Sequence, residues 1–359
     1  TGSKRAVIFC GDWLEREGEL LGLVRGALGE RCAGIFAGVV AHSPVASVEA
    51  AAAELRRLNA DAAIAIGGGS VIVTARAASI LAAEGKPARE LCTTQDATGA
   101  LKSPKLLAAK MPQILVPTTP TTAMVKAGSA VFEPETGERL ALFDPKTRTS
   151  AVFIHPALIA SAPTALVVSS SLNTFAMAIE GLTSRTGNPI ADGLLMHAMR
   201  LIAQHLARPE TLDDPAVRGE LMIAAVLCGQ GTDHTAAGIT TVLGHAIGAR
   251  YHTENGLANA IVLPHVLRFN GDAALSGLEK VAAALGLPRG GNDTVSMVGY
   301  SVKSIFSALG IPKRLRDVGV PQDALPAIAE LAMGDWFLRG NPRPVREAAQ
   351  LQEVLQDAW

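Results

Sequence analysis

Apolar and polar positions alternate in two different ways along the chain. In its first part, short apolar runs rich in β-forming residues are separated by Ala-, Leu- and Glu-rich stretches typical of helices. One such helix is predicted over 47–60, with Ser47 as its capping residue. The alternation predicts the α/β class, a parallel sheet with helices on its faces. Strands are predicted at 5–10, 32–39, 62–70, 113–119 and 149–156, and a hairpin at 130–144 around Thr136–Gly137.

The pattern changes after the two prolines of "HPALIASAP" (155–163). Beyond them, long Ala-, Leu- and Met-rich segments recur, broken at Gly and Pro and with few β-branched runs. This residue pattern predicts a helical domain. We therefore expect an α/β domain over 1–158 and an all-α domain over 159–359.

Composition narrows the class of protein. The 359 residues are too many for one comfortable core, which agrees with two domains. Hydrophobic residues make up 48% and the net charge is −1, which gives no electrostatic case for nucleic acid or an anionic membrane as partner. The apolar runs are short and the N-terminus lacks a secretion pattern, so we expect a cytoplasmic protein. The cysteines lack metal-site spacing and are expected to be buried free thiols: Cys10, Cys32, Cys92 and Cys228.

A glycine-rich turn is the first candidate binding site. "IGGGS" (66–70) joins a predicted strand to a predicted helix. Glycines let the backbone approach a ligand closely, and a helix N-terminus suits a pyrophosphate. "VPTTPTT" (116–122) adds hydroxyl groups at the end of another strand. A turn without a ligand remains the alternative. The candidate cofactor-binding residues are Gly67, Gly68, Gly69, Ser70, Thr118, Thr119 and Thr122.

Several longer motifs match the pattern of a known family. These are "IGGGS", "VPTT", "LGHAIGARYHTENGLANAIVLPHVLRFN" (243–270) and "LGIPKRLRDVGV" (309–320). They resemble the iron-containing alcohol dehydrogenase superfamily, which has the dehydroquinate synthase-like fold. "AHSPVASV" (41–48), "SLNTFAMAIEGL" (171–182) and the tail 341–359 resemble its maleylacetate reductase branch. The resemblance implies a Rossmann-like dinucleotide-binding domain before an all-α domain, an active cleft between them, and NAD(H) or NADP(H) as cofactor. We also expect a homodimer.

The resemblance also assigns four metal positions, and this sequence departs at most of them. The family's Asp falls on Asn173 and its three His residues fall on Met177, His245 and Asn255. Neutral amides and a thioether are poor ligands for Fe²⁺ or Zn²⁺. We therefore expect that these side chains bind no metal ion directly. His252 is the one nearby imidazole that could substitute.

Without a Lewis acid, side chains must stabilise charge on the substrate oxygen. The expected catalytic residues are His245 as proton or hydrogen-bond donor, His252, and Asn173 and Asn255 as amide donors. A vestigial His245 is the alternative. Met177 is expected to contact the substrate.

Charged residues give further candidates. Lys126 and Arg250, and more weakly Arg185, are candidates for binding a substrate carboxylate. Asp12 is expected to accept from an adenosine ribose hydroxyl, which favours NADH over NADPH.

The cofactor region departs from the family pattern as well. Val73 and Arg76 stand where the broader family has Asp and Lys, and Pro120 and Ala123 lie in a turn where the family has a glycine. The leading hypothesis is a metal-independent NAD(P)H-dependent reductase of a small carbonyl or enone acid, similar to maleylacetate reductase. The alternatives are a non-redox lyase, isomerase or cyclase on the same scaffold, and an inactive binding protein.

Overall fold

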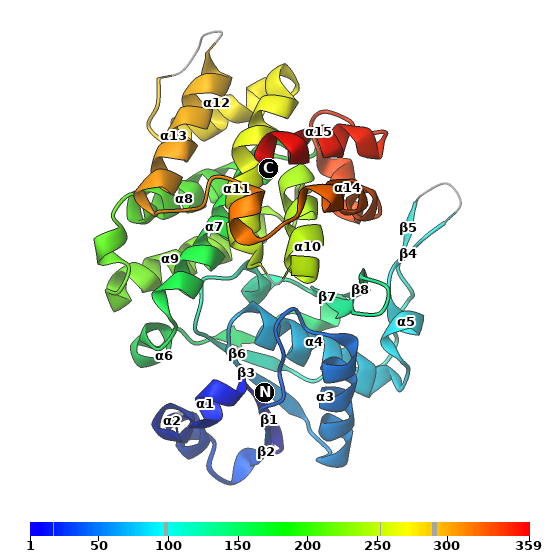
Figure 1. The fold of residues 1–359 in the computed structure, drawn as a ribbon. Helices are drawn as coiled ribbons and strands as arrows, with labels where there is room; N and C mark the ends of the chain where they lie inside the picture. The colour runs from blue at the N-terminus through cyan, green and yellow to red at the C-terminus, as the bar shows by residue number, and fades with distance from the viewer. Residues whose placement is uncertain (17, 97–99, 252, 289–292) are drawn as a thin grey trace. The chain divides into compact units, whose positions relative to one another are not determined.

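The computed structural model describes residues 1–16, 18–96, 100–251, 253–288 and 293–359. The chain divides into two compact units, Thr1–Ala162 and Pro163–Trp359. The first is an α/β unit and the second is helical, as the ribbon in Figure 1 shows for each. Each unit is described by itself below.

The α/β unit is built on a parallel sheet with the strand order β2-β1-β3-β6-β9. Its central strands β1 and β3 are buried along their whole length, as continuous apolar runs are when helices cover both faces of a sheet. The predicted fold class is confirmed. The strands are β1 (Ala6–Phe9), β2 (Cys32–Phe36), β3 (Ala62–Gly67), β6 (Gln113–Pro117) and β9 (Ala151–Val152).

The strand order places a switch point at the centre of the sheet. From β1 the chain crosses to β2 on one side, and it later returns to β3 on the other side of β1. Loops that leave the carboxyl ends of β1 and β3 therefore run in opposite directions. In open α/β sheets ligands bind in the crevice that this divergence leaves. The loop after β1 begins at Cys10, and the loop after β3 is the glycine turn.

Helices and two hairpins complete this unit. The predicted hairpin turn is confirmed, because Gly137 has the positive φ of 74° that this turn needs. The helix predicted from 47 begins earlier, at Val45, and Ser47 does not cap it; the Ser47 hydroxyl donates to the Gly38 carbonyl instead. The elements are α1 (Asp12–Arg16), α2 (Gly18–Leu28), α3 (Val45–Arg57), α4 (Gly69–Glu84), α5 (Ala88–Leu91), α6 (Pro156–Ala160), hairpin β4 (Thr94–Gln95) and β5 (Leu101–Lys102), hairpin β7 (Gly128–Glu133) and β8 (Glu138–Phe143), and the 3-10 turn η2 (Thr122–Val125).

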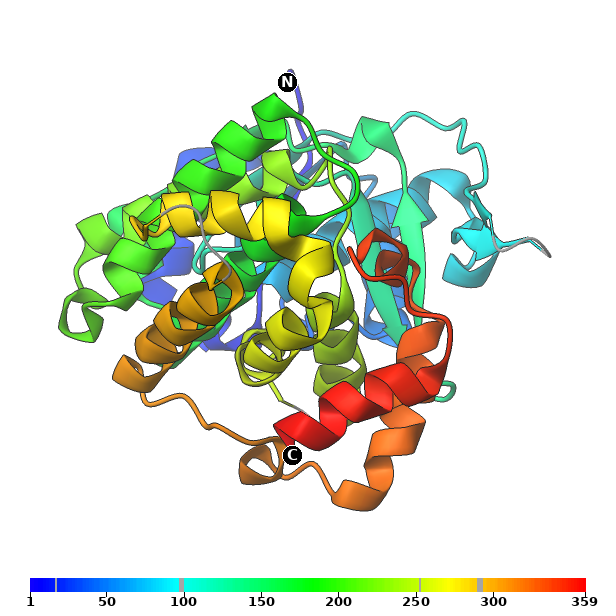
Figure 2. The ribbon, with the colours of Figure 1, turned by 90° about the horizontal axis from the view of Figure 1, so that it is seen from above.

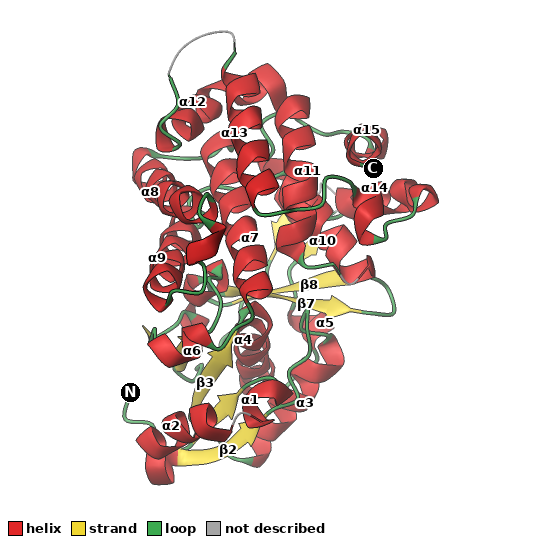
Figure 3. Ribbon diagram, turned by 60° about the vertical axis from the view of Figure 1, so that its left-hand side comes forward, coloured by secondary structure: helices red, strands yellow, loops and turns green. Residues whose placement is uncertain are grey.

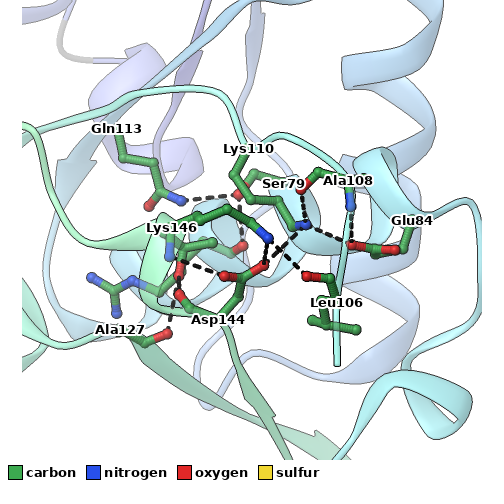
Figure 4. A network of polar contacts seen from close by, with 11 residues as sticks. Ser79, Glu84, Leu106, Ala108, Lys110, Gln113, Ala127, Asp144 and Lys146 are labelled. Carbon is green, nitrogen blue, oxygen red and sulfur yellow. Dashed lines mark hydrogen bonds and ion pairs between the residues drawn. The ribbon is translucent and has the colours of Figure 1, made fainter. Parts of the chain in front are cut away.

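A buried lysine ties three segments of the α/β unit together (Figure 4). Lys110 lies in the loop before β6 and its side chain is fully buried. Its ammonium group lies 2.6 Å from Glu84 Oε1, at the end of α4, and 3.0 Å from Asp144 Oδ2, after β8. It also donates to the Ala108 carbonyl. Two carboxylates and a carbonyl thus replace the water that the buried cation has lost.

The four cysteines are free thiols. Cys10, Cys92 and Cys228 are buried, but Cys32 is only partly buried, so the expectation of burial is wrong for Cys32. Cys32 lies on β2, an edge strand of the sheet, which has a neighbouring strand on one side only. Burial raises the pKa of Cys10 to about 11, which keeps this thiol protonated at neutral pH.

The second unit is all-α over its described residues, which confirms the prediction (Figure 3). Helix α8 follows Asn188 and α9 follows Asp214, and each capping side chain is followed by a proline in the first turn. The C-terminal helix α15 packs on α14 and α11 (Figure 2). The helices are α7 (Thr164–Thr183), α8 (Pro189–Leu206), α9 (Pro215–Gly231), α10 (Ile239–Tyr251), α11 (Asn255–Asn270), α12 (Leu275–Ala284), α13 (Thr294–Ala308), α14 (Leu325–Met333) and α15 (Ala348–Ala358).

Helix α7 is the core helix of this unit. Its 20 residues are long and apolar enough to cross a membrane by length and composition, but 67% of the relevant window is buried inside the protein. Helices α8, α9, α11 and α12 pack around it. Burial by neighbouring helices explains its apolar character without a membrane.

Glycines let α10, α11 and α7 approach one another closely. A Cβ at Gly244 of α10 would lie 1.8 Å from Asn259 Oδ1 of α11, and one at Gly248 would lie 2.2 Å from Asn255 Oδ1. A Cβ at Gly256 of α11 would lie 1.7 Å from the Ser169 carbonyl oxygen of α7. These contacts are possible only without a side chain, so the glycines set the spacing of the helices that carry the candidate catalytic residues.

Candidate functional site

Larger residues in the glycine turn of the α/β unit would crowd its neighbours. Gly67, the last residue of β3, has a φ of 152°. A Cβ at Gly68 would lie 2.9 Å from Thr119 Oγ1, and one at Gly69 would lie 3.2 Å from Thr121 Oγ1. The turn is therefore packed directly against the threonines that follow β6. The backbone of the turn and these hydroxyls form the candidate cradle for a phosphate group.

The first turn of α4 is held from a second side. The Ser70 hydroxyl accepts a hydrogen bond from the His42 backbone N–H, and the Ser43 hydroxyl donates to the Ser70 carbonyl. His42 and Ser43 both have positive φ values, of 61° and 51°, which bring this loop back toward α4. The helix has 16 residues, so its N-terminus carries the partial positive charge that suits a phosphate group.

A buried arginine holds the threonine segment (residues 118–122) in place. Thr118, Thr119 and Thr122 are buried. Arg76 of α4 is fully buried, and its guanidinium donates to the Ala123 carbonyl at 2.7 Å and to the Gly128 carbonyl at 3.1 Å. Arg76 therefore holds η2 and the start of β7 beside α4. The glycine turn and the threonine segment thus form one wall at the carboxyl edge of the sheet.

Asp12 lies at the same edge, directly after β1. It is the first residue of α1, is exposed, and forms an ion pair of 3.0 Å with Arg16 one turn later. Because β1 and β3 are neighbours, Asp12 and the glycine turn lie on the two sides of the switch point. Lys126 follows η2 and is half-buried.

In the helical unit, Asn173 and Met177 meet on one face of α7, as their spacing predicts. The Asn173 Nδ2 lies 3.6 Å from the Met177 sulfur. Asn259 Nδ2 of α11 donates to Asn173 Oδ1 at 2.9 Å in one orientation of the Asn259 amide. In the swapped orientation the Asn259 nitrogen donates instead to the Thr240 carbonyl of α10, also at 2.9 Å. Asn259 of α11 therefore lies within hydrogen-bond distance of both α7 and α10.

His245 is paired with a carboxylate that the sequence analysis missed. His245 Nδ1 lies 2.8 Å from Asp335 Oδ2, and the two side chains are only 14% and 9% exposed. The other oxygen, Asp335 Oδ1, accepts from the Phe337 backbone N–H at 3.0 Å and so caps the 3-10 turn η8 (Trp336–Gly340). The Phe337 ring lies against the imidazole, with 6.0 Å between ring centroids.

The helix that carries His245 is itself anchored by a buried acid. Glu180 of α7 accepts hydrogen bonds from the Thr240 and Thr241 backbone N–H groups and from the Thr241 hydroxyl. These groups lie in the first turn of α10, so Glu180 satisfies N–H groups that the helix cannot. Burial raises the pKa of Glu180 despite these donors.

The remaining candidates lie in different settings. Asn255 begins α11; its Oδ1 is buried against Gly248 and has no hydrogen-bond partner among the described residues. Arg250 is exposed at the end of α10. Arg185 donates to the Arg339 carbonyl at 2.6 Å, which ties it to η8. His252 lies outside the described residues.

The family models and relatives agree on one family. A model described as "Iron-containing alcohol dehydrogenase" matches residues 1–156, and one described as "Fe-containing alcohol dehydrogenase family, C-terminal" matches 167–359. The chain belongs to the iron-containing alcohol dehydrogenase family. Expectations of an enzyme of this family, and of an oxidoreductase, are thereby confirmed.

Relatives within the iron-containing alcohol dehydrogenase family are named for different substrates. A lactaldehyde reductase of Escherichia coli (strain K12) is 29% identical over 90% of this chain and 84% of its own length. A maleylacetate reductase of Sphingobium indicum is 30% identical over 90% of this chain and 82% of its own length. A solved 1,3-propanediol oxidoreductase has a TM-score of 0.90 at 25% identity, covering 100% of this chain and 93% of that one.

The family name implies iron, and the residues present do not fit it. The four positions that the resemblance assigns to the metal hold one imidazole, two carboxamides and a thioether in this chain. Asn173 is engaged with Asn259, and Asn255 turns its oxygen against Gly248. No group of three or more His, Cys, Asp or Glu side chains suited to a metal ion occurs among the residues that the structure describes. This donor set lacks the anionic oxygens and multiple imidazoles that such ions prefer.

Proposed function

We propose that this protein is a NAD(P)H-dependent reductase of a small carbonyl or enone acid, similar to maleylacetate reductase, that works without a metal ion. The observation that carries the proposal is the buried His245–Asp335 pair at a position where the family has a metal ligand. An imidazole that a carboxylate holds in place can supply the proton that a carbonyl oxygen needs on reduction.

The α/β unit supplies the cofactor site in this proposal. The glycine turn and the first turn of α4 fit the pyrophosphate, and the threonine wall limits where the rest of the dinucleotide lies. Asp12, at the other side of the switch point, orients the adenosine ribose and favours NADH. When bound, the reduced nicotinamide supplies a hydride to the substrate.

The helical unit supplies the acid. His245 delivers a proton to the substrate oxygen, and the amides of Asn173 and Asn255 donate hydrogen bonds to that oxygen as it gains charge. Because Asn255 Oδ1 is turned against Gly248, its Nδ2 is the end that serves as donor. Lys126 and Arg250 are the proposed partners of a substrate carboxylate.

The test uses purified protein, NADH or NADPH, and two probe carbonyls, lactaldehyde and maleylacetate. We expect NADH binding by fluorescence titration, consumption of reduced nicotinamide with at least one probe, no stoichiometric Fe, Zn or Mn by elemental analysis, and activity that survives EDTA. His245→Ala should lower kcat by about two to four powers of ten, the range of general acid–base catalysis.

Specific outcomes count against the proposal. One tightly held transition metal per chain contradicts metal independence. Absence of any dinucleotide binding contradicts the reductase and favours the non-redox alternative. The matched control is His205→Ala, which removes another His–carboxylate pair of the helical unit, 2.7 Å from Glu220, and should leave kcat unchanged.

A further inference from the structure

We propose that Asn259 fixes Asn173 with its carbonyl oxygen on the side of Met177, and that this oxygen accepts a hydrogen bond from a hydroxyl group of the substrate. The inference rests on the proposed function above and narrows its substrate to a small carbonyl compound that also carries a hydroxyl. Asn259 acts through Asn173, 86 positions away in sequence, and is therefore a positioning residue. Its side chain lies on α11, which packs on both α7 and α10, and the residue is 1% exposed.

The carboxamide of Asn259 has two ends, and each end faces different groups. One end lies 2.9 Å from the Thr240 carbonyl oxygen and 3.3 Å from the Asn255 carbonyl oxygen. The other end lies 2.9 Å from the carboxamide of Asn173. The first end reaches the backbone of α10 so closely because Gly244 has no side chain, since a Cβ there would lie 1.8 Å from the Asn259 carboxamide.

The two backbone carbonyls decide the orientation of Asn259. A carbonyl oxygen only accepts hydrogen bonds, so the end of Asn259 that faces the Thr240 and Asn255 carbonyls is the amide nitrogen. An oxygen at this end would meet two other oxygens in a buried place with no proton between them, which is unfavourable. With the nitrogen at this end, Asn259 Oδ1 faces Asn173 and requires a donor there.

The orientation of Asn173 follows from that of Asn259. Asn173 faces Asn259 Oδ1 with its nitrogen, so the atom that lies 3.6 Å from the Met177 sulfur is its carbonyl oxygen. This exchange gives up one N–H contact with a thioether, which is a weak acceptor, and gains hydrogen bonds to carbonyl oxygens. Asn173 and Met177 are half-buried whereas Asn259 is buried, so the oxygen lies at the more open end of the Asn173 amide.

A carbonyl oxygen at this place selects for a hydrogen-bond donor on the substrate. In the proposed function, the substrate oxygen that is reduced receives hydrogen bonds from the second N–H of Asn173 and from Asn255. The carbonyl oxygen of Asn173 then serves a different group, and a hydroxyl is the donor that a small carbonyl compound carries. A site that hydrogen-bonds a substrate hydroxyl discriminates against the analogue that lacks it, because its own polar group then has no partner.

Neutron diffraction from crystals of the perdeuterated parent protein tests the orientation without any substrate. Deuterium atoms scatter neutrons strongly, so the nitrogen end of an amide is seen directly. We expect the deuterium atoms of the Asn259 amide on the side of the Thr240 carbonyl, and one deuterium of Asn173 directed at Asn259. Asn341 is the internal reference in the same unit, because its Oδ1 accepts from the Ile239 backbone N–H.

Kinetics with two aldehydes test the recognition of the hydroxyl. Lactaldehyde and propionaldehyde differ only in that hydroxyl, and the measured quantity is the ratio of their kcat/KM values with NADH. Comparing this ratio between the parent and a variant cancels the intrinsic reactivity of the two aldehydes. We expect the ratio to fall at least about tenfold in Asn173→Leu, which removes the acceptor, and about threefold to tenfold in Asn259→Leu, which no longer fixes it.

The matched control addresses loss of stability. Asn188 caps α8 by accepting hydrogen bonds from the Ile190 and Ala191 backbone N–H groups, so Asn188→Ala weakens the same helical unit at its surface. Its melting temperature should fall while the ratio of the two aldehydes stays at the parental value. If Asn259→Leu does not fold, the neutron structure of the parent and the ratio in Asn173→Leu still decide the inference.

The outcomes separate this inference from the proposed function. Deuterium atoms on the Asn173 side of the Asn259 amide would overturn the assigned orientation. An unchanged ratio in Asn173→Leu, or the same fall in Asn188→Ala, would overturn the recognition of a hydroxyl; a raised KM for NADH with an unchanged ratio would make the cofactor the partner of Asn173 instead. Absence of both dinucleotide binding and carbonyl reduction contradicts the proposed function, and the hydroxyl preference falls with it, whereas the neutron result still decides the orientation.

Discussion

Replacing Lys110 by Met tests how the α/β unit is held together. Lys110 is fully buried and lies within 3.0 Å of both Glu84 and Asp144 (Figure 4). Removing one partner from a buried ionic network costs about 3–5 kcal/mol, because the remaining charges are left without compensation. Asp144 keeps the Lys146 ammonium at 3.3 Å, and Glu84 keeps the Ala108 N–H at 3.1 Å. Because these contacts remain, we expect the free energy of unfolding to fall by the lower end of that range, about 3 kcal/mol.

The assay is urea and thermal unfolding of the parent and of Lys110→Met at neutral pH. For a unit of this size, 1 kcal/mol corresponds to about 2–4 °C, so the melting temperature of the α/β unit should fall by about 6–12 °C. The matched control is Lys146→Met. Lys146 also faces Asp144, but its side chain is 43% exposed, so its removal should cost about 1 kcal/mol or less.

The pKa shifts of Glu84 and Asp144 give the direction in which this stabilisation changes with pH. The hydrogen bond from Lys110 lowers the pKa of Glu84. At Asp144, burial acts to raise the pKa, but the Lys146 backbone N–H and Lys110 together outweigh it and lower it. Lowered folded-state values mean that the stabilisation is complete above the unfolded-state pKa values, about 4, and is lost as the pH falls through the folded-state values.

The difference in stability between parent and Lys110→Met should therefore be largest at neutral pH and shrink below about pH 4. The reasoning is refuted if Lys110→Met costs no more than Lys146→Met, or if the difference between parent and variant is as large in acid as at neutral pH.

Two further predictions concern glycines. Gly68→Val places a Cβ 2.9 Å from Thr119 Oγ1 and a side chain in the cradle, so NADH affinity by fluorescence titration should fall at least about tenfold while the circular dichroism spectrum is kept. The control is Gly22→Ala, because nothing lies near a Cβ at Gly22. Unchanged affinity in Gly68→Val would show that the cofactor binds elsewhere. Gly244→Ala places a Cβ 1.8 Å from Asn259 Oδ1 and should destabilise the helical unit by about 2 kcal/mol in urea unfolding. Gly219→Ala on α9 has nothing near its Cβ and should instead be neutral or stabilising; equal effects at the two sites would contradict the close approach of α10 and α11.

The sequence by itself determined the local elements and the order in which they occur. Buried strands such as β3 are continuous apolar runs, and the turn at Gly137 is encoded by a short polar stretch, because strand and turn preferences act over a few neighbouring residues. Helical spacing alone was also enough to place Asn173 and Met177 on one face of α7. The position of the α4 N-terminus followed from three glycines after a strand.

Only the tertiary structure decided which side chains become partners. Nothing local to His245 predicts Asp335, and nothing local to Asn173 predicts Asn259, because each pair is joined by the packing of helices that are distant in sequence. Lys110 stands in a loop, where a lysine is normally solvated, and its burial follows from the meeting of α4 and β8 around it. Local patterns fix backbone conformation, whereas partners of buried polar groups depend on how the elements pack, and it is these partners that determine the chemistry of the candidate site.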